Sequence, residues 1–285
     1  MAMKENLRTL LGAGWLGWQM EANWTDPFLF LVYSVAKPVS GALILVFMYI
    51  VILGGVAAQR DAFAFIFLGN AFFIYVGQVL FGVTWVIHED REHFQTLKLI
   101  YISPISFYYY IIGRAGSKIL IATIAVVVTL LFGVFVLGIP VDAFTMDWGL
   151  LILCLTVGMA CLVSIGIALA GITFLTAKHS GGINEGIAGL FYVFCGVVFP
   201  ITQLPAWGQS LGYAIPVTYW LEAMRKALLP AQQLEGTGLQ GIENFWLVAL
   251  LAVSALFFYF LSILIFRLGD YLARRAGKID MTTAY

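Results

Sequence analysis

The sequence His88-Glu89-Asp90-Arg91-Glu92-His93, called the charged island below, lies between two long runs without charge. Residues 62–87 before it and 119–139 after it contain no Asp, Glu, Lys or Arg. About 20 apolar helical residues are enough to cross the ~30 Å core of a bilayer. We therefore predict that both runs cross a membrane and that the island lies at its surface, where another molecule can contact it.

The composition of the chain predicts an integral membrane protein. Of its 285 residues, 62% are hydrophobic and 11% are charged, whereas soluble domains carry about 25% charged residues. A water-soluble fold cannot bury so much apolar surface in one core, so we predict an all-α membrane protein with one domain, 1–285. The six predicted transmembrane spans are 28–57, 62–87, 107–139, 148–176, 183–203 and 244–267.

The N-terminal segment 1–27 is predicted to be an interfacial helix. Apolar residues recur on one of its faces at helical spacing, and tryptophans are typical of membrane interfaces. The residues on this face are Leu7, Leu11, Trp15, Trp18 and Ala22.

The segment 204–243 is predicted to form re-entrant helices and a loop on the outer side of the membrane. Trp220 and Met224 share one helical face, and Glu222 and Arg225 lie around the opposite side. This pattern is typical of an amphipathic helix that lies on, or dips into, a leaflet.

The basic residues are distributed unevenly between the two sides of the predicted topology. Among the 15 Lys and Arg residues, the outer side holds only Arg60, Arg225 and Lys226. Basic residues mark the cytoplasmic side of a membrane protein. We therefore predict a multi-pass protein of the cytoplasmic (inner) membrane, with both termini, segment 88–104 and tail 268–285 in the cytoplasm.

The island superficially resembles a zinc motif, but its spacing is wrong. His88 and His93 are five residues apart, which places them about 140° apart around a helix, whereas HExxH needs two His at i and i+4. The three cysteines lie in apolar runs without other ligands and are predicted to be buried hydrophobic residues. We predict no metal site.

No nucleotide-binding motif is found in the chain. The segment Gly113–Lys118 lacks the spacing of a phosphate-binding loop and follows no predicted strand. If the protein uses ATP and Mg, another polypeptide must bind them, and we predict no cofactor and no catalytic residue in this chain.

Small residues cluster in the fourth and fifth predicted spans. Ala160, Ser164 and Ala168 recur every four residues, and Gly182 and Gly186 form a GxxxG pair. Such residues let helices approach closely. We favour packing within one subunit over a seam between two subunits.

Two stretches of sequence are similar to those of a known family. The first runs through Glu89-Asp-Arg-Glu92, Gln95-Thr-Leu-Lys98, Ser103-Pro104 and Gly113-Arg114. The second runs from Ile215-Pro216 to Arg225, although many family members have Asn where this chain has Ile215. With the order of helices over nearly the whole chain, these stretches resemble the permease subunits of type-2 ABC exporters.

The resemblance implies roles for several residues. Segment 88–104 would be the coupling helix that docks on a separate cytoplasmic ATPase subunit, present in two copies. Its expected contact residues are Glu89, Asp90, Arg91, Glu92, His93, Phe94 and Leu97. The outer re-entrant segment would gate the exit of a pathway shared with a second permease, identical or homologous, through Pro205, Trp207, Pro216, Tyr219 and Trp220.

The expected function is ATP-driven export of a hydrophobic, lipid-linked or glycan substrate. Membrane lipids are expected as further partners, and nucleic acid is not. Two other interpretations stay open. One is an intramembrane lipid-modifying enzyme that uses His88, Glu89 and His93. The other is a membrane assembly factor that transports nothing.

Overall fold

A computed structural model describes residues 2–22, 26–53, 60–139, 141, 144, 146–175, 180–229, 239 and 241–277. No strand occurs in these ranges, as the all-α prediction required. Three predicted segments lie wholly or mostly outside the described residues: the outer turn near 58, loop 230–243, and tail residues 278–285. The α-helices are α1 (Ala2–Ala22), α2 (Pro27–Leu53), α3 (Arg60–Tyr75), α4 (Gly82–His88), α5 (Leu97–Ile102), α6 (Phe107–Phe135), α7 (Trp148–Thr173), α8 (Ser180–Phe194), α9 (Ala206–Ala214), α10 (Pro216–Leu228) and α11 (Asn244–Arg275).

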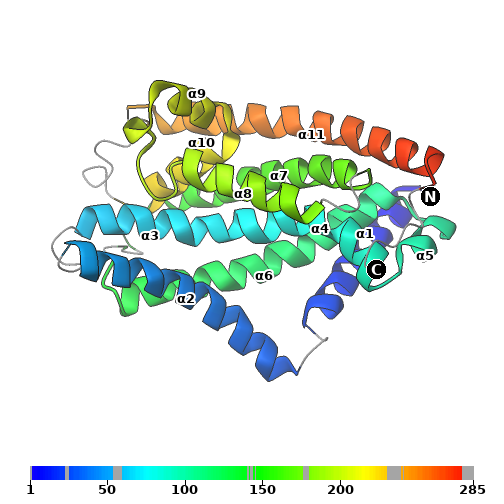
Figure 1. The fold of residues 1–285 in the computed structure, drawn as a ribbon, viewed down its shortest axis with the longest axis horizontal. Helices are drawn as coiled ribbons and strands as arrows, with labels where there is room; N and C mark the ends of the chain where they lie inside the picture. The colour runs from blue at the N-terminus through cyan, green and yellow to red at the C-terminus, as the bar shows by residue number, and fades with distance from the viewer. Residues whose placement is uncertain are drawn as a thin grey trace.

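Most of the helices lie side by side along the long axis of the molecule (Figure 1). α1 and α5 lie at one end, called the island end, and α9 lies toward the other. Four helical stretches of the described chain are long and apolar enough to cross a membrane: Ala62–His93, Phe107–Phe135, Trp148–Thr173 and Asn244–Arg275. These correspond to predicted spans two, three, four and six.

The second span extends further than the sequence indicated. Helix α3 continues through a π-helical turn, η2 (Val76–Phe81), into α4 and then a second π-helical turn, η3 (Glu89–His93). The charged island is therefore the last turn of a transmembrane helix, and only α5 forms a separate short helix within 88–104. The prediction of one coupling helix over that whole range is wrong.

Helices α7 and α11 pack closely because two glycines face each other. A Cβ atom built on Gly269 would overlap the carbonyl group of Gly171, so neither position has room for a side chain. At its start, α7 is capped by the Asp147 carboxylate, which accepts a hydrogen bond from Leu150 N at 3.0 Å. Helix α11 ends at Arg275, eight residues beyond predicted span six.

The fifth predicted span, 183–203, is shorter in the structure. Helix α8 has 15 residues, which span about 22 Å at 1.5 Å per residue, less than the ~30 Å bilayer core. Gly196 has a φ of +70°, a left-handed conformation that suits glycine and turns the chain away from the helix. After Pro200, a 3₁₀ turn, η4 (Ile201–Gln203), leads into α9. The chain therefore turns near residue 195, inside the range predicted as span five, and the re-entrant character of the segment after it stays a prediction.

Helix α10 is a core helix, which contradicts a position on the surface of a leaflet, whereas the alternative that it dips into the outer leaflet stays a prediction. Both its apolar face and its charged face are buried, including Glu222 and Arg225. It packs against α3, α7 and α11. The amphipathic pattern arises because its polar face contacts backbone groups of the protein instead of water.

The small residues predicted to pack closely have different surroundings in α7 and α8. In α7, Ser164 and Ala168 are buried, and a Cβ on Gly166 would crowd Leu80 and Val83, so packing within the subunit is confirmed at these positions, whereas Ala160 is exposed. In α8, by contrast, no atom of the described chain lies within 4 Å of a Cβ built on Gly182 or Gly186. The described residues therefore provide no partner for this GxxxG pair, and intra-subunit packing stays a prediction there.

Candidate functional site

A buried ionic cluster joins the charged island to α6. The guanidinium of Arg114 donates to Glu89 Oε2 at 3.0 Å and to Asp90 Oδ1 at 3.3 Å. The side chains of Arg114 and Asp90 are both fully buried, and that of Glu89 is 24% exposed. A buried charge is tolerated only when it is paired and hydrogen-bonded. This pairing therefore fixes the island to the third span.

The same cluster includes the N-terminal helix. Lys118 Nζ forms ion pairs with Glu21 of α1 and with Glu89, the latter at 3.3 Å. Three acidic and two basic side chains from α1, the α4–η3 helix and α6 thus form one connected group, called the ionic cluster below: Glu21, Glu89, Asp90, Arg114 and Lys118. Helix α6 is the shared partner, since its Arg114 and Lys118 pair with the island and Lys118 also pairs with α1.

Glycines bring α1 and α6 close enough for the cluster to form. A Cβ atom on Gly113 would overlap the Leu10 carbonyl oxygen and lie 2.7 Å from the Ala13 Cβ atom. A Cβ on Gly17 would overlap Ser117 in the same way. The opposite face of α1 is apolar and exposed at Leu7, Leu11 and Trp15, as an interfacial helix requires.

Four of the predicted contact residues have buried side chains. Asp90 belongs to the ionic cluster, and Leu97 is 1% exposed. Arg91 Nε donates to Glu92 Oε1 at 3.0 Å, and these two side chains are 3% and 5% exposed. In this conformation these side chains cannot form a docking surface, because they already pack within the subunit. His93 is exposed and Phe94 half-buried, with their ring centroids 4.7 Å apart.

A surface that the sequence reasoning missed lies on α5 and the turn after it. Leu97 and Ile100 are buried, whereas Leu99 and Ile102 are 61% and 81% exposed, and Ile105 in the turn that follows is 36% exposed. Lys98 and His93 are exposed beside them. We call Leu99, Ile102 and Ile105 the α5 surface. The signal was present in the sequence, since residues three apart share one face of a helix.

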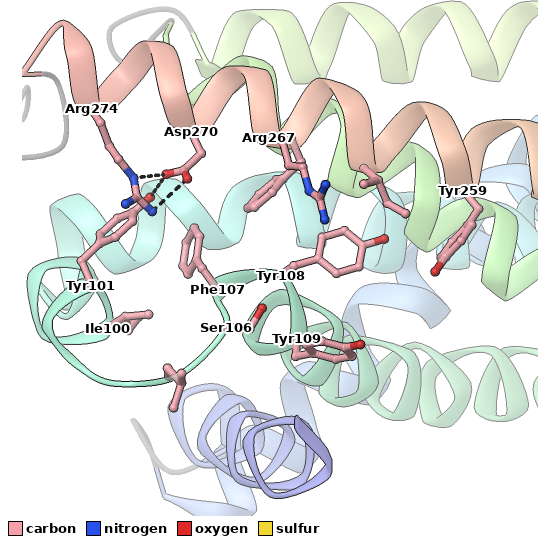
Figure 2. A pocket seen from close by; sticks show the side chains of 13 residues that line it. Ile100, Tyr101, Ser106, Phe107, Tyr108, Tyr109, Tyr259, Arg267, Asp270 and Arg274 are labelled. Atoms are coloured by element: carbon pink, nitrogen blue, oxygen red, sulfur yellow. Dashed lines mark hydrogen bonds and ion pairs between the residues drawn. The ribbon is translucent and has the colours of Figure 1, made fainter. Parts of the chain in front are cut away.

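Helix α5 is also tied to the end of α11. Tyr101 donates a hydrogen bond to Asp270 Oδ1 at 2.5 Å, and Arg274 Nε donates to the same oxygen at 3.0 Å. The Arg274 guanidinium lies 4.7 Å from the centroid of the Tyr101 ring (Figure 2). Burial, together with the hydrogen bond to Asp270 and its negative charge, raises the pKa of Tyr101.

At the opposite end, the predicted gate residues fall into two groups. Pro216 and Trp220 are buried in the core, where Trp220 Nε1 donates to Cys154 O at 3.1 Å. Pro205 and Trp207 are exposed on α9, and Tyr219 is half-buried, with its hydroxyl bonded to Tyr213 O at 2.7 Å. The structure therefore keeps only Pro205, Trp207 and Tyr219 near an accessible surface.

Arg225 holds the re-entrant turn in place, a role that the sequence reasoning did not assign. Its guanidinium donates to the carbonyl oxygens of Phe65, Gly196 and Val197 at 3.2, 2.8 and 3.2 Å. It also lies 3.6 Å from the centroid of the Phe65 ring. These contacts join α3, the turn after α8, and α10.

His88 and Glu89, two residues of the enzyme interpretation, have other partners within the chain. His88 stacks on Trp85 with a centroid distance of 4.3 Å, and Glu89 is occupied by its two cations. Within the described ranges, no three His, Cys, Asp or Glu side chains form a group that could hold a metal ion. The absence of a metal and of a cofactor stays a prediction.

The apolar helices define a class, an α-helical, multi-pass membrane protein, and the ionic cluster lies at one end of it. A search among curated proteins returned no match. The family model for the ABC-2 type transporter matches residues 14–229, which is more than half of the chain. The chain therefore belongs to the ABC-2 type transporter family, as a permease subunit, and the resemblance identified from the sequence is confirmed.

Proposed function

We propose that this permease subunit works in an ATP-driven exporter of the cytoplasmic membrane, with both termini in the cytoplasm. Two copies of a separate ABC ATPase would supply ATP hydrolysis, and a second permease, identical or homologous, would complete the transporter. The substrate class is hydrophobic, lipid-linked or glycan.

The observation that carries the proposal is the ionic cluster beside the α5 surface. An ATPase that binds Leu99 and Ile102 would contact α5, which is tied to α11 through Tyr101 and follows directly on the island. The cluster then connects the island to α1 and α6. A force applied at α5 would therefore reach the first helix and several spans together.

The α8 glycines support the proposed second permease. Gly182 and Gly186 are exposed, and no atom of the described chain lies near where their Cβ atoms would be. Glycines at this spacing let two helices pack closely in a membrane. An α8 that packs against a second permease would cover this face and place the pathway between the two subunits.

The test is co-purification of the permease with the candidate ABC ATPases of its source organism. Ile102→Asp places a charge on the apolar α5 surface and is expected to reduce ATPase binding at least tenfold, because burying an unpaired carboxylate is costly. Val136→Asp is the matched control. Val136 is also an exposed aliphatic residue, but it directly follows the last residue of α6, far from α5.

If the unaltered chain retains no ATPase, the proposed function is wrong. Should the ATPase bind equally well to the Ile102→Asp variant, the docking site lies elsewhere. Zinc bound in stoichiometric amount and dependent on His88 and His93 would instead support the enzyme interpretation.

A further inference from the structure

A pocket of about 590 Å³ opens at the island end, between α5, the start of α6 and the last turns of α11. Tyr101, Asp270 and Arg274 form one end of it, and Arg267 lies beside Tyr108 further along α11 (Figure 2). A volume of this size is in the range of about 300–1,000 Å³ that is typical of small-molecule sites. The transport mechanism proposed above does not use it.

The charges that line the pocket do not cancel. Asp270 is paired with Arg274, whose Nη2 lies 2.9 Å from Asp270 Oδ2. Arg267 also lines the pocket, is exposed, and forms no ion pair or hydrogen bond with any described side chain. The lining therefore has one uncompensated positive charge, located beside Tyr108 (Figure 2). Arginine is well suited to bind a phosphate group.

An apolar surface continues from the pocket along α11. Phe260 and Leu264 are 67% and 66% exposed, and Leu268 and Tyr271 are exposed next to Arg267. Helix α11 is long and apolar enough to span a membrane, so acyl chains can cover this surface. An arginine at the level where an apolar helix leaves the bilayer is placed to meet lipid headgroups.

We propose that this pocket binds the headgroup of an anionic phospholipid, with its phosphate on Arg267 and its acyl chains along Phe260 and Leu264. In the proposed orientation the lipid belongs to the cytoplasmic leaflet, and that part of the assignment rests on the proposed function. Because Tyr101 and Phe107 also line the pocket, a bound lipid contacts the same segment that carries the α5 surface.

The experiment is a lipid titration of the purified permease alone, followed by native mass spectrometry, with phosphatidylglycerol and phosphatidylcholine as probes. Arg267→Gln is expected to weaken phosphatidylglycerol binding about fivefold, since one basic residue near a lipid surface contributes roughly 1 kcal/mol. Arg275→Gln is the matched control, because Arg275 is exposed on the same helix and does not line the pocket. Its effect is expected to be less than twofold.

Tighter binding of phosphatidylglycerol than of phosphatidylcholine, lost in Arg267→Gln alone, would establish the site. Equal losses in both arginine variants, or equal affinity for the two lipids, would overturn it. Soluble glycerol 1-phosphate is included as a competitor, and displacement of the lipid by it at similar concentration would show that the site binds free phosphate compounds instead. None of these results depends on an ATPase or on transport, so the failure of one proposal does not decide the other.

Discussion

Arg114 at the island end and Arg225 near the opposite end are both buried cations, but their partners differ in kind. Arg225 binds three backbone carbonyl oxygens, whose positions are set by the fold. Arg114 binds carboxylates on side chains, and its neighbour Lys118 binds another from α1. Backbone partners hold one arrangement, whereas charged side chains can exchange partners when helices move. The comparison indicates a fixed end around Arg225 and an adjustable island end.

The largest effect is expected at Arg225. Arg225→Met leaves three buried carbonyl groups without their donor, which should lower the free energy of unfolding by about 4 kcal/mol. Unfolding in detergent micelles measures this loss. The main partners of Arg225 are neutral carbonyl groups. Removing the nearby charge with Glu222→Gln is therefore not expected to restore stability. Full recovery in the double variant would show that Arg225 is held by charge after all.

The Arg114 site should respond in the opposite way to charge removal. Arg114→Met leaves Glu89 and Asp90 without their main cation and is expected to cost about 3 kcal/mol. Adding Glu89→Gln and Asp90→Asn should restore at least half of this, because Glu21 and Lys118 then remain as a balanced pair. A triple variant less stable than Arg114→Met alone would remove the contrast between the two ends.

The crossing of α1 and α6 tests whether the ionic cluster depends on close packing. Gly113→Ala should cost about 2 kcal/mol, since its Cβ would collide with α1. Gly116→Ala is the control on the same helix, with open space around its Cβ, and should stabilise by about 0.5–1 kcal/mol. The melting temperatures of the two variants measure these effects. Similar shifts in both would contradict the close contact between α1 and α6 at Gly113.

The smallest effect is expected at Tyr101. Tyr101→Phe removes one hydrogen bond to Asp270 and should cost about 1 kcal/mol at neutral pH. Since the pKa of Tyr101 is raised in the folded state, its contribution is complete below its ordinary value of 10.0 and declines as the unfolded chain ionises above that pH. The stability difference from Tyr101→Phe should therefore shrink between pH 9 and 11. A constant difference would show that the fold does not raise the pKa of Tyr101.

Much of the fold followed from hydropathy, because runs such as 119–139 can only be stable as helices in a bilayer. The sequence could not show that α10 is buried, since Glu222 and Arg225 read as a water-facing surface until backbone carbonyls are placed around them. It also could not divide the island into an interior part and an exposed part. That division depends on Arg114 and Lys118, which lie more than twenty residues later in the chain.

The unbroken helix from Ala62 to His93 has 32 residues. At 1.5 Å per residue it is about 48 Å long, so a tilt of 10° displaces one end relative to the other by about 8 Å. The π-helical turn η2 lies near its middle, and such turns bend more readily than regular helix. The second span can therefore act as a lever with a pivot near its middle, converting a small rotation at the island end into a large displacement at the other end.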